Sequence, residues 1–158
     1  MKNQTSSLDL SHFPVMLNEI IEITSPSKGG SYIDCTFGGG SYSKELLKFP
    51  KTIVTGLDRD KTINVIAKKL KKEFPKRFKF YQIKFSQLDK VSKNHVDAVI
   101  FDLGLSSIQL KDMNRGFSFK SLKNLDMSMG LNKISAKEVV NNLSELDLKL
   151  IIKILGEE

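Results

Sequence analysis

The chain has 158 residues, of which 40% are hydrophobic and 27% charged, and these values exclude wholesale disorder and a fibrous repeat while suiting one domain with a single core. Its single cysteine, Cys35, excludes an intrachain disulfide and a cysteine metal cluster, and no apolar run reaches the roughly 18 residues of a membrane span, so that we expect a cytoplasmic protein. The net charge of +7 favours approach to a polyanion such as RNA, although much of the lysine excess lies in residues 68–79, which can equally form a solvated face.

Helical and strand patterns alternate over the first hundred residues. After a polar leader over residues 1–12, the segment FPVMLNEIIEI has the apolar spacing of a helix. Short apolar runs predict four strands, at residues 31–37, 52–58, 77–85 and 96–105. A helix is predicted between the second and third strands, over residues 61–74. This alternation is typical of βαβ units and indicates an α/β fold with a doubly wound, mostly parallel sheet.

The chain changes character after the fourth predicted strand. Residues 106–134 show little periodicity, and a long irregular segment inside a compact domain is commonly functional. Two helical patterns follow, one with Ser135 and Glu138 spaced as a capping box and one that begins at Ser144. We therefore expect the end of the chain to be helical.

Three consecutive glycines, Gly38–Gly40, separate the first predicted strand from a predicted helix in the sequence YIDCTFGGGSYSKELL. The backbone N–H groups that open a helix have no intrahelical partner, and glycine lets a ligand approach them closely. The bend is therefore either a cofactor site or a tight turn alone. The G-x-G-x-x-G pattern of dinucleotide sites is incomplete, because Ser43 takes the place of its third glycine.

Asp58 ends the second predicted strand, 20 positions after Gly38. An acidic side chain in this place of an α/β fold accepts hydrogen bonds from the two hydroxyl groups of a ribose. The alternative is a helix cap, a role that Asp60 could also fill. Together the glycines and Asp58 indicate an adenosine cofactor, either a nicotinamide dinucleotide or S-adenosylmethionine. The lack of a Walker lysine after the glycines disfavours a nucleoside triphosphatase.

Asp102 follows the most apolar predicted strand in the sequence FDLGLSSIQL, beside the crevice in which open α/β sheets hold their ligands. A carboxylate in this position can orient an amino group and stabilise the positive charge that develops on it during methyl transfer. Asp102 is therefore the candidate catalytic residue.

The sequence resembles the bacterial 16S ribosomal RNA cytosine-N4 methyltransferases, which use S-adenosylmethionine. Eight ordered stretches carry the resemblance: HFPVMLNEII, YIDCTFGGGSYS, GLDRD, FSQLD, FDLGLSSIQL, RGFSF, LDMSM and GEE. The resemblance implies a Rossmann-like class I methyltransferase fold. It also implies N4-methylation of the cytidine at position 1402 of 16S rRNA, in the 30S ribosomal subunit.

The family's motifs, matched position by position, imply a set of cofactor contacts in this chain: Gly40, Ser41, Tyr42, Asp58, Phe85, Asp102 and Gln109. In this match the bend faces the methionine end of S-adenosylmethionine, Asp58 binds the ribose and Phe85 lies by the adenine. Asp102 and Gln109 lie beside the reacting group. Ser41 stands where most members have glycine.

The resemblance also implies a domain organisation. Residues 1–12 are expected to be a flexible leader, residues 13–125 a partial S-adenosylmethionine-binding domain, and residues 126–158 the start of a helical insertion that recognises the substrate. With the sheet cut after its fourth strand, we expect a fragment with weak cofactor binding. Two alternatives stay open, a nicotinamide-dependent oxidoreductase and a non-catalytic RNA-binding remnant of a methyltransferase.

The segment RGFSF, residues 115–119, has two interpretations. Arg115 can contact a phosphate while Phe117 and Phe119 stack on the bases of a single-stranded nucleic acid. Alternatively, the two phenylalanines pack the loop down onto the protein. The sequence leaves both interpretations open.

Overall fold

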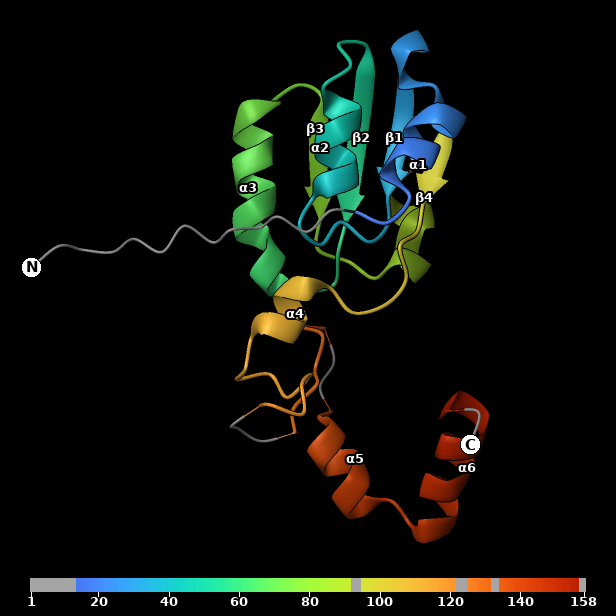
Figure 1. Cartoon of the computed structure of the whole chain (residues 1–158), viewed down its shortest axis with the longest axis vertical. Coiled ribbons are helices and arrows are strands. Elements are labelled where there is room, and N and C mark those ends of the chain that lie inside the picture. Colours follow the sequence, from blue (N-terminus) through green and yellow to red (C-terminus); the bar gives the residue numbers. More distant parts are fainter. Residues whose placement is uncertain (1–13, 92–94, 122–124, 132–133, 157–158) are drawn as a thin grey trace, which may run out of the picture. The chain divides into compact units, whose positions relative to one another are not determined.

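The computed structural model describes residues 14–91, 95–121, 125–131 and 134–156 (Figure 1). The chain forms two compact units, residues 1–106 and residues 107–158. The boundary expected from the sequence, between residues 125 and 126, lies inside the second unit. The functional division into a cofactor domain and a recognition insertion therefore stays a prediction, and the expected leader lies outside the described residues.

The first unit is built on a sheet of four parallel strands, which confirms the predicted α/β fold. The strands are β1 (Gly30–Asp34), β2 (Thr52–Leu57), β3 (Phe78–Tyr81) and β4 (Ala98–Ile100). Their order in the sheet is β3-β2-β1-β4, and every neighbouring pair is parallel. The chain moves outward from β1 to β3 and then crosses back to place β4 on the other side of β1. The order of the strands therefore reverses at β1 and β4, which is where sheets of this class bind their ligands.

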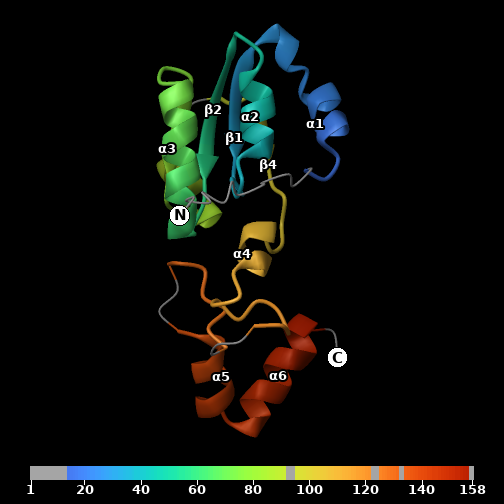
Figure 2. The ribbon, with the colours of Figure 1, turned by 60° about the vertical axis from the view of Figure 1, so that its left-hand side comes forward.

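Helices and 3₁₀ turns connect the strands. They are α1 (Leu17–Thr24), η1 (Pro26–Lys28), α2 (Ser41–Leu47), η2 (Lys61–Ile63), α3 (Asn64–Glu73) and η3 (Phe85–Lys90). In Figures 1 and 2, α2 and α3 lie on the same face of the sheet. This placement follows from the right-handed crossovers β1-α2-β2 and β2-α3-β3, which move in the same direction across the sheet.

Side chains alternate between the two faces of the sheet, and both faces contribute to the core. On one face Tyr32, Val54 and Phe78 are in register across three strands, and all three are buried. On the other face Ile33, Cys35 and Leu57 form a buried cluster. Partly buried side chains around η3 pack against this cluster: Ile83, Leu88, Val91 and Val96. This second face is covered only in part, because Val99, in register with Ile33, is 37% exposed and Ile53 is 47% exposed.

The strands end earlier than the apolar runs that predicted them. The run over residues 31–37 becomes a strand only to Asp34, and the run over residues 96–105 becomes a strand only from Ala98 to Ile100. Beyond these points the backbone leaves the ladder for other partners, and the N–H group of Asp102 donates to Oγ1 of Thr36 at 2.8 Å. The apolar residues past the strand ends therefore belong to the loops above the sheet, where a site can form.

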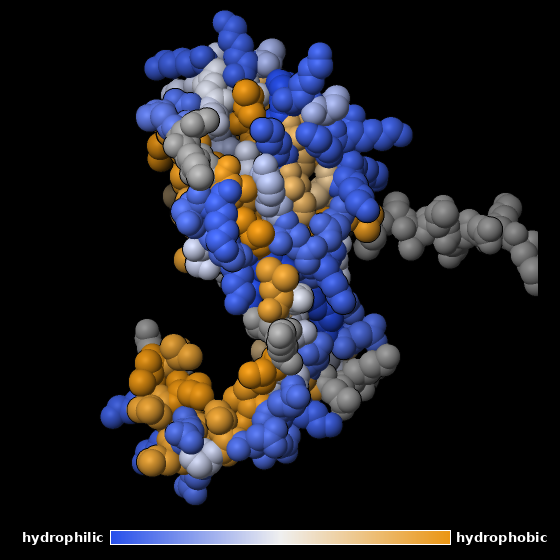
Figure 3. All heavy atoms as spheres, turned by 180° about the vertical axis from the view of Figure 1, so that it is seen from behind, coloured by the Kyte–Doolittle hydropathy of each residue, from blue (hydrophilic) through white to orange (hydrophobic). Residues whose placement is uncertain are grey.

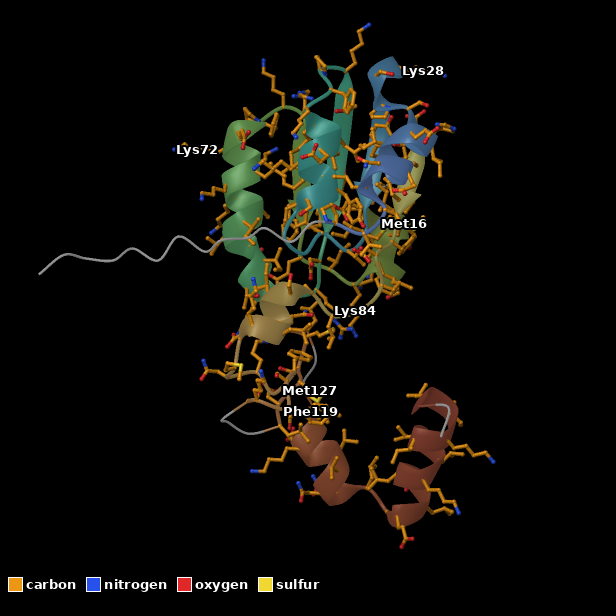
Figure 4. All side chains as sticks on the ribbon, viewed as in Figure 1. Met16, Lys28, Lys72, Lys84, Phe119 and Met127 are labelled. Atoms are coloured by element: carbon orange, nitrogen blue, oxygen red, sulfur yellow. The ribbon has the colours of Figure 1, made fainter. Side chains whose placement is uncertain are left out.

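The basic run over residues 68–79 does not form one cationic surface. The guanidinium group of Arg77 donates to the backbone carbonyl oxygens of Phe49 and Leu47, and the Lys71 ammonium group donates to that of Phe78. Lys72 points away from α3 (Figure 4). The run thus combines cations that stabilise the fold with cations on a solvated helix face. This agrees with the solvated-face interpretation and not with one continuous RNA-binding surface.

The described part of the second unit combines helices with irregular segments over residues 112–121 and 125–131. It contains α4 (Ser107–Lys111), α5 (Ala136–Asn142) and α6 (Glu145–Gly156). The predicted capping box is confirmed, because the Ser135 side chain accepts from the Glu138 N–H group and the Glu138 side chain accepts from the Ser135 N–H group. Hydrophobic side chains gather over α5 and α6 (Figure 3). Within the described residues, no helix combines the length and the hydropathy needed to cross a membrane.

Candidate cofactor and methyl-transfer site

The glycine bend begins four residues after Asp34, the buried end of β1, and leads into α2. Gly38 and Gly40 have φ angles of 49° and 76°, in the left-handed region that favours glycine. A Cβ atom at Gly40 would lie 2.6 Å from Cζ of Phe37. Phe37 is itself buried and packs against Phe78 and Phe80, with ring centroids 5.4 and 5.2 Å apart. Gly40 is therefore required by the turn, while its contact with a cofactor stays a prediction.

The middle of the bend is open. A Cβ atom placed on Gly39 would meet no atom within 4 Å. Ser41 is the first residue of α2 and is half-buried. Most members of the family that the sequence resembles have glycine at this position. Packing against Phe37 thus requires glycine at position 40, whereas Gly39 leaves space in which a ligand can approach the backbone.

Asp58 connects the end of β2 to the bend. Its Oδ2 accepts a hydrogen bond of 2.8 Å from the Gly38 N–H group, and its Oδ1 accepts one of 2.8 Å from the Asp60 N–H group. Burial raises the pKa of the Asp58 carboxyl group above its ordinary value, and these backbone donors oppose the rise. The side chain is only partly buried, so its remaining lone pairs can accept further hydrogen bonds.

The two roles considered for the neighbouring aspartates are now separated. Asp60 caps η2, since its Oδ1 accepts a hydrogen bond of 3.0 Å from the Thr62 N–H group. Asp58 caps no helix in the described part of the chain and lies instead against the glycine bend. Of the two aspartates that the sequence offered as caps, Asp60 is therefore the one that caps, and the ribose contact of Asp58 stays a prediction.

Asp102 lies against α2, on the other side of β1 from Asp58. Its Oδ2 is 3.2 Å from the hydroxyl oxygen of Tyr42, and its side chain is exposed. Tyr42 is buried, with 6% of its surface exposed, and burial first and the negative charge of Asp102 second raise the pKa of the phenol to about 12. The structure thus brings the candidate catalytic carboxylate to the bend, through a contact between residues 60 positions apart.

Two exposed aromatic rings lie together at the same end of the sheet. Phe85 is 43% exposed and meets Phe101, which is 48% exposed, edge to face with ring centroids 5.6 Å apart. Phe85 opens η3 after β3, and Phe101 directly precedes Asp102. The sequence predicted a role for Phe85 but none for Phe101. An exposed ring at this place can stack on a flat group such as adenine.

The remaining predicted residues lie in the second unit. Gln109 belongs to α4 and is buried, and its proximity to the other site residues stays a prediction. In the RGFSF segment, Nη2 of Arg115 donates to the Ser128 carbonyl oxygen at 2.7 Å, and the guanidinium group lies 5.2 Å from the ring centroid of Phe117. These contacts favour the packed-loop interpretation for this pair. Phe119 is instead fully exposed (Figure 4).

Asp34 is a buried acid that sequence reasoning did not single out. It ends β1, is fully buried, and accepts a hydrogen bond of 2.7 Å on Oδ2 from the Ser43 hydroxyl group. Burial raises its pKa to about 6, and the hydrogen bonds from Ser43 and Thr36 only partly offset this. The signal available in the sequence was a lone acid inside the apolar run YIDCTF. Its contact with Ser43 fixes α2 to the end of β1.

Replacing Asp34 with asparagine is expected to flatten the dependence of stability on pH. A carboxyl pKa raised from 3.8 to about 6 makes the folded state bind more protons than the unfolded state in this window, so the free energy of unfolding falls as pH rises through it. Asparagine can still accept from Ser43 but carries no charge. The free energy of unfolding of the variant, relative to that of wild type, should therefore rise by on the order of 2 kcal/mol from pH 4 to pH 7. Urea unfolding at both pH values measures this gain, and equal slopes in the two proteins would show that Asp34 does not cause the effect.

The comparisons with known proteins agree on one family. A family model described as the MraW methylase family matches residues 9–158. Similar curated proteins carry the name ribosomal RNA small subunit methyltransferase H. The one from Anaplasma phagocytophilum (strain HZ) is 42% identical over 155 residues, which are 94% of this chain and 52% of the relative. That of Rickettsia massiliae (strain Mtu5) is 42% identical over 149 residues, 94% of this chain and 48% of the relative.

A third relative, from Ehrlichia ruminantium (strain Welgevonden), bears the same name and is 40% identical over 153 residues, 93% of this chain and 51% of the relative. The chain thus spans about half the length of the curated relatives it matches. Among solved structures, an rRNA methylase from Streptococcus thermophilus is similar with a TM-score of 0.45 and 16% identity, over 54% of each chain. The family model and the named relatives support a methyltransferase and not the nicotinamide-dependent alternative.

Proposed function

Because this chain belongs to the MraW methylase family, we propose that the protein transfers a methyl group from S-adenosylmethionine to the N4 amino group of a cytidine in 16S rRNA. The nucleotide implied by the resemblance is cytidine 1402, within the 30S subunit. The observation that carries the proposal is the exposed carboxylate of Asp102, held against the helix that the glycine bend opens. This arrangement brings an acceptor for an amino group next to a bend suited to a cofactor.

The residues at this end of the sheet fit S-adenosylmethionine. Gly39 leaves open space beside the bend, where the methionine part of the cofactor would lie near Ser41. Asp58 has acceptor capacity left for the ribose hydroxyl groups, and Phe85 offers an exposed ring for the adenine. When bound, S-adenosylmethionine supplies a methyl group carried on a positively charged sulfur.

Asp102 would act on the amino group of the cytosine. The lone pair of N4 is delocalised into the ring, and the nitrogen must rehybridise before it can attack a methyl carbon. A carboxylate that accepts a hydrogen bond from N4–H favours this change and stabilises the positive charge that develops on the nitrogen. The base must also leave its stack to reach the carboxylate, and single-stranded or unpaired nucleotides do so at the lowest cost.

The proposed RNA substrate agrees with the charge of the chain and with the relatives. The net charge of +7 favours association with a polyanion, and the related proteins are named for methylation of small-subunit ribosomal RNA. A non-catalytic RNA-binding protein would share the charge. It would not need an exposed carboxylate beside the glycine bend, so we favour the enzyme.

Incubation of the purified protein with 30S subunits and methyl-labelled S-adenosylmethionine tests the proposal. We expect label to enter the RNA of subunits that lack the modification, because these subunits present an unmethylated amino group. Subunits prepared from cells that already carry the modification serve as the matched control and should take up no label. Binding of the protein to unmodified subunits without any uptake of label would instead indicate the non-catalytic alternative.

A further inference from the structure

Phe85 and Phe101 meet although the strands that they follow lie at opposite edges of the sheet. Phe85 comes four residues after the end of β3, and Phe101 directly follows β4, while β2 and β1 lie between these two strands. The segment that leaves β3 therefore crosses the sheet to bring the two ring centroids within 5.6 Å. The contact places both rings at the carboxyl ends of the strands, where open α/β sheets bind their ligands.

The side chains on either side of Phe85 show where the crossing segment lies. Ile83 and Leu88 pack against a buried cluster that includes Leu57, the last residue of β2. Leu57 is followed directly by Asp58, the proposed ribose contact. The base and the ribose of a nucleoside are bonded to each other, so a ring that stacks on the base must lie near the residue that binds the ribose. The place of Phe85, beside the end of β2, agrees with this requirement.

The two rings are nearly perpendicular, with an angle of 89° between their planes. This arrangement is attractive, because the positive edge of one ring meets the negative face of the other. Whichever ring supplies the edge, at least one face of Phe85 stays clear of Phe101. The Phe85 side chain is 43% exposed, so a flat group has access to it. Phe101 thus fixes the tilt of the Phe85 ring without covering it.

The backbone around Phe101 is held on both sides. The carbonyl oxygen of Ile100 accepts a hydrogen bond of 2.9 Å from the Cys35 N–H group, and the Asp102 N–H group donates to Oγ1 of Thr36 at 2.8 Å. Both partners belong to the loop that leaves β1. The Phe101 ring therefore starts from a fixed backbone, which a ring needs if it is to restrain another one.

We propose that Phe101 is a positioning residue for the cofactor, because its ring holds the Phe85 ring in the orientation that stacks on adenine. The inference rests on the proposed function, in which Phe85 is the adenine contact. Without this restraint the Phe85 side chain would have to be ordered when the base binds, and such ordering weakens affinity. The effect of Phe101 therefore reaches the cofactor through Phe85.

Titration calorimetry with S-adenosylhomocysteine tests this role in wild type, Phe101→Leu, Phe85→Leu and the double variant. We expect Phe101→Leu to weaken binding about three- to tenfold, which corresponds to the cost of ordering one side chain. In the Phe85→Leu background the same change should weaken binding less than about twofold, since no ring is left to be held. Equal losses in the two backgrounds, or no loss in Phe101→Leu, would overturn the role of Phe101.

Phe74→Leu is the matched control for the loss of a phenylalanine ring. Phe74 is partly buried and lies between α3 and β3, at the amino end of that strand. Its replacement should leave the affinity for S-adenosylhomocysteine at the wild-type value. A loss in Phe74→Leu as large as that in Phe101→Leu would mean that any ring removed from this unit weakens binding, and it would contradict the inference.

A second measurement uses wild type alone, so it does not depend on the folding of a variant. With S-adenosylhomocysteine bound, we expect nuclear Overhauser contacts between H2 or H8 of the adenine and the ring protons of Phe85. Their absence would overturn the stacking on Phe85 and with it the role of Phe101. If wild type does not bind S-adenosylhomocysteine at all, the proposed cofactor is wrong and the inference fails with it. Binding by wild type with equal losses in the two backgrounds would refute the role of Phe101 alone.

Discussion

Replacement of Asp102 with alanine is expected to lower the rate of methyl transfer by about 100-fold or more and to weaken cofactor binding by a much smaller factor. The loss follows because the carboxylate both accepts from the amino group and stabilises the charge that develops on it, and removal of one such group costs roughly 10² to 10³ in kcat. Asp102 is exposed and does not hold the core together. Single-turnover transfer to 30S subunits measures the rate, and calorimetric titration with S-adenosylhomocysteine measures the binding.

Asp89→Ala provides the matched control for this variant, since Asp89 is an exposed carboxylate on η3. It should transfer methyl groups at the rate of wild type. Equal activity of Asp102→Ala and Asp89→Ala would remove Asp102 from the chemistry. A parallel loss of binding and rate in Asp102→Ala would instead assign the residue to the cofactor alone.

Replacement of Gly40 with alanine is expected to destabilise the protein by roughly 2–5 kcal/mol. The left-handed backbone at a φ of 76° costs a residue with a Cβ atom about 1–2 kcal/mol. The new methyl group would also lie 2.6 Å from the ring of Phe37, and forcing an extra carbon into a packed core costs about 1–3 kcal/mol. The ring cannot move away cheaply, because Phe78 and Phe80 pack against it. Urea unfolding followed by circular dichroism measures the change.

Gly39→Ala is the control for the bend, because a Cβ atom at Gly39 meets nothing within 4 Å. Its free energy of unfolding should stay within about 1 kcal/mol of wild type. Similar losses in the two variants would mean that glycine is needed at both positions for a reason other than the contact with Phe37.

Local patterns in the sequence were sufficient to predict the frame of the site. The apolar runs predicted all four strands, and the glycines at the end of the first run predicted the bend into α2. The spacing of 20 residues between Gly38 and Asp58 predicted that both belong to one cofactor site, and in the structure a hydrogen bond of 2.8 Å joins them. These features follow from strand length and crossover geometry, which repeat among sheets of this class.

The details of the site depend on contacts that no local pattern carries. The contact between Tyr42 and Asp102 joins residues 60 positions apart and arises because β4 lies beside β1. The pairing of Phe85 with Phe101 likewise depends on how η3 lies against the end of β4. In the sequence Asp34 is only one residue of an apolar strand pattern. Its role in fixing α2 to β1 is visible only from the hydrogen bond that it accepts from the Ser43 hydroxyl group. Such contacts are set by the packing of whole elements, so spacing along the chain cannot reveal them.

The most direct test of the central claim is mass spectrometry of the 16S rRNA fragment that contains cytidine 1402, after unmodified 30S subunits have been incubated with the protein and S-adenosylmethionine. The proposed function predicts a methyl group on N4 of that cytidine, present with wild type and strongly reduced with Asp102→Ala. A fragment that stays unmodified with wild type, or a methyl group found on another atom or nucleotide, would contradict it.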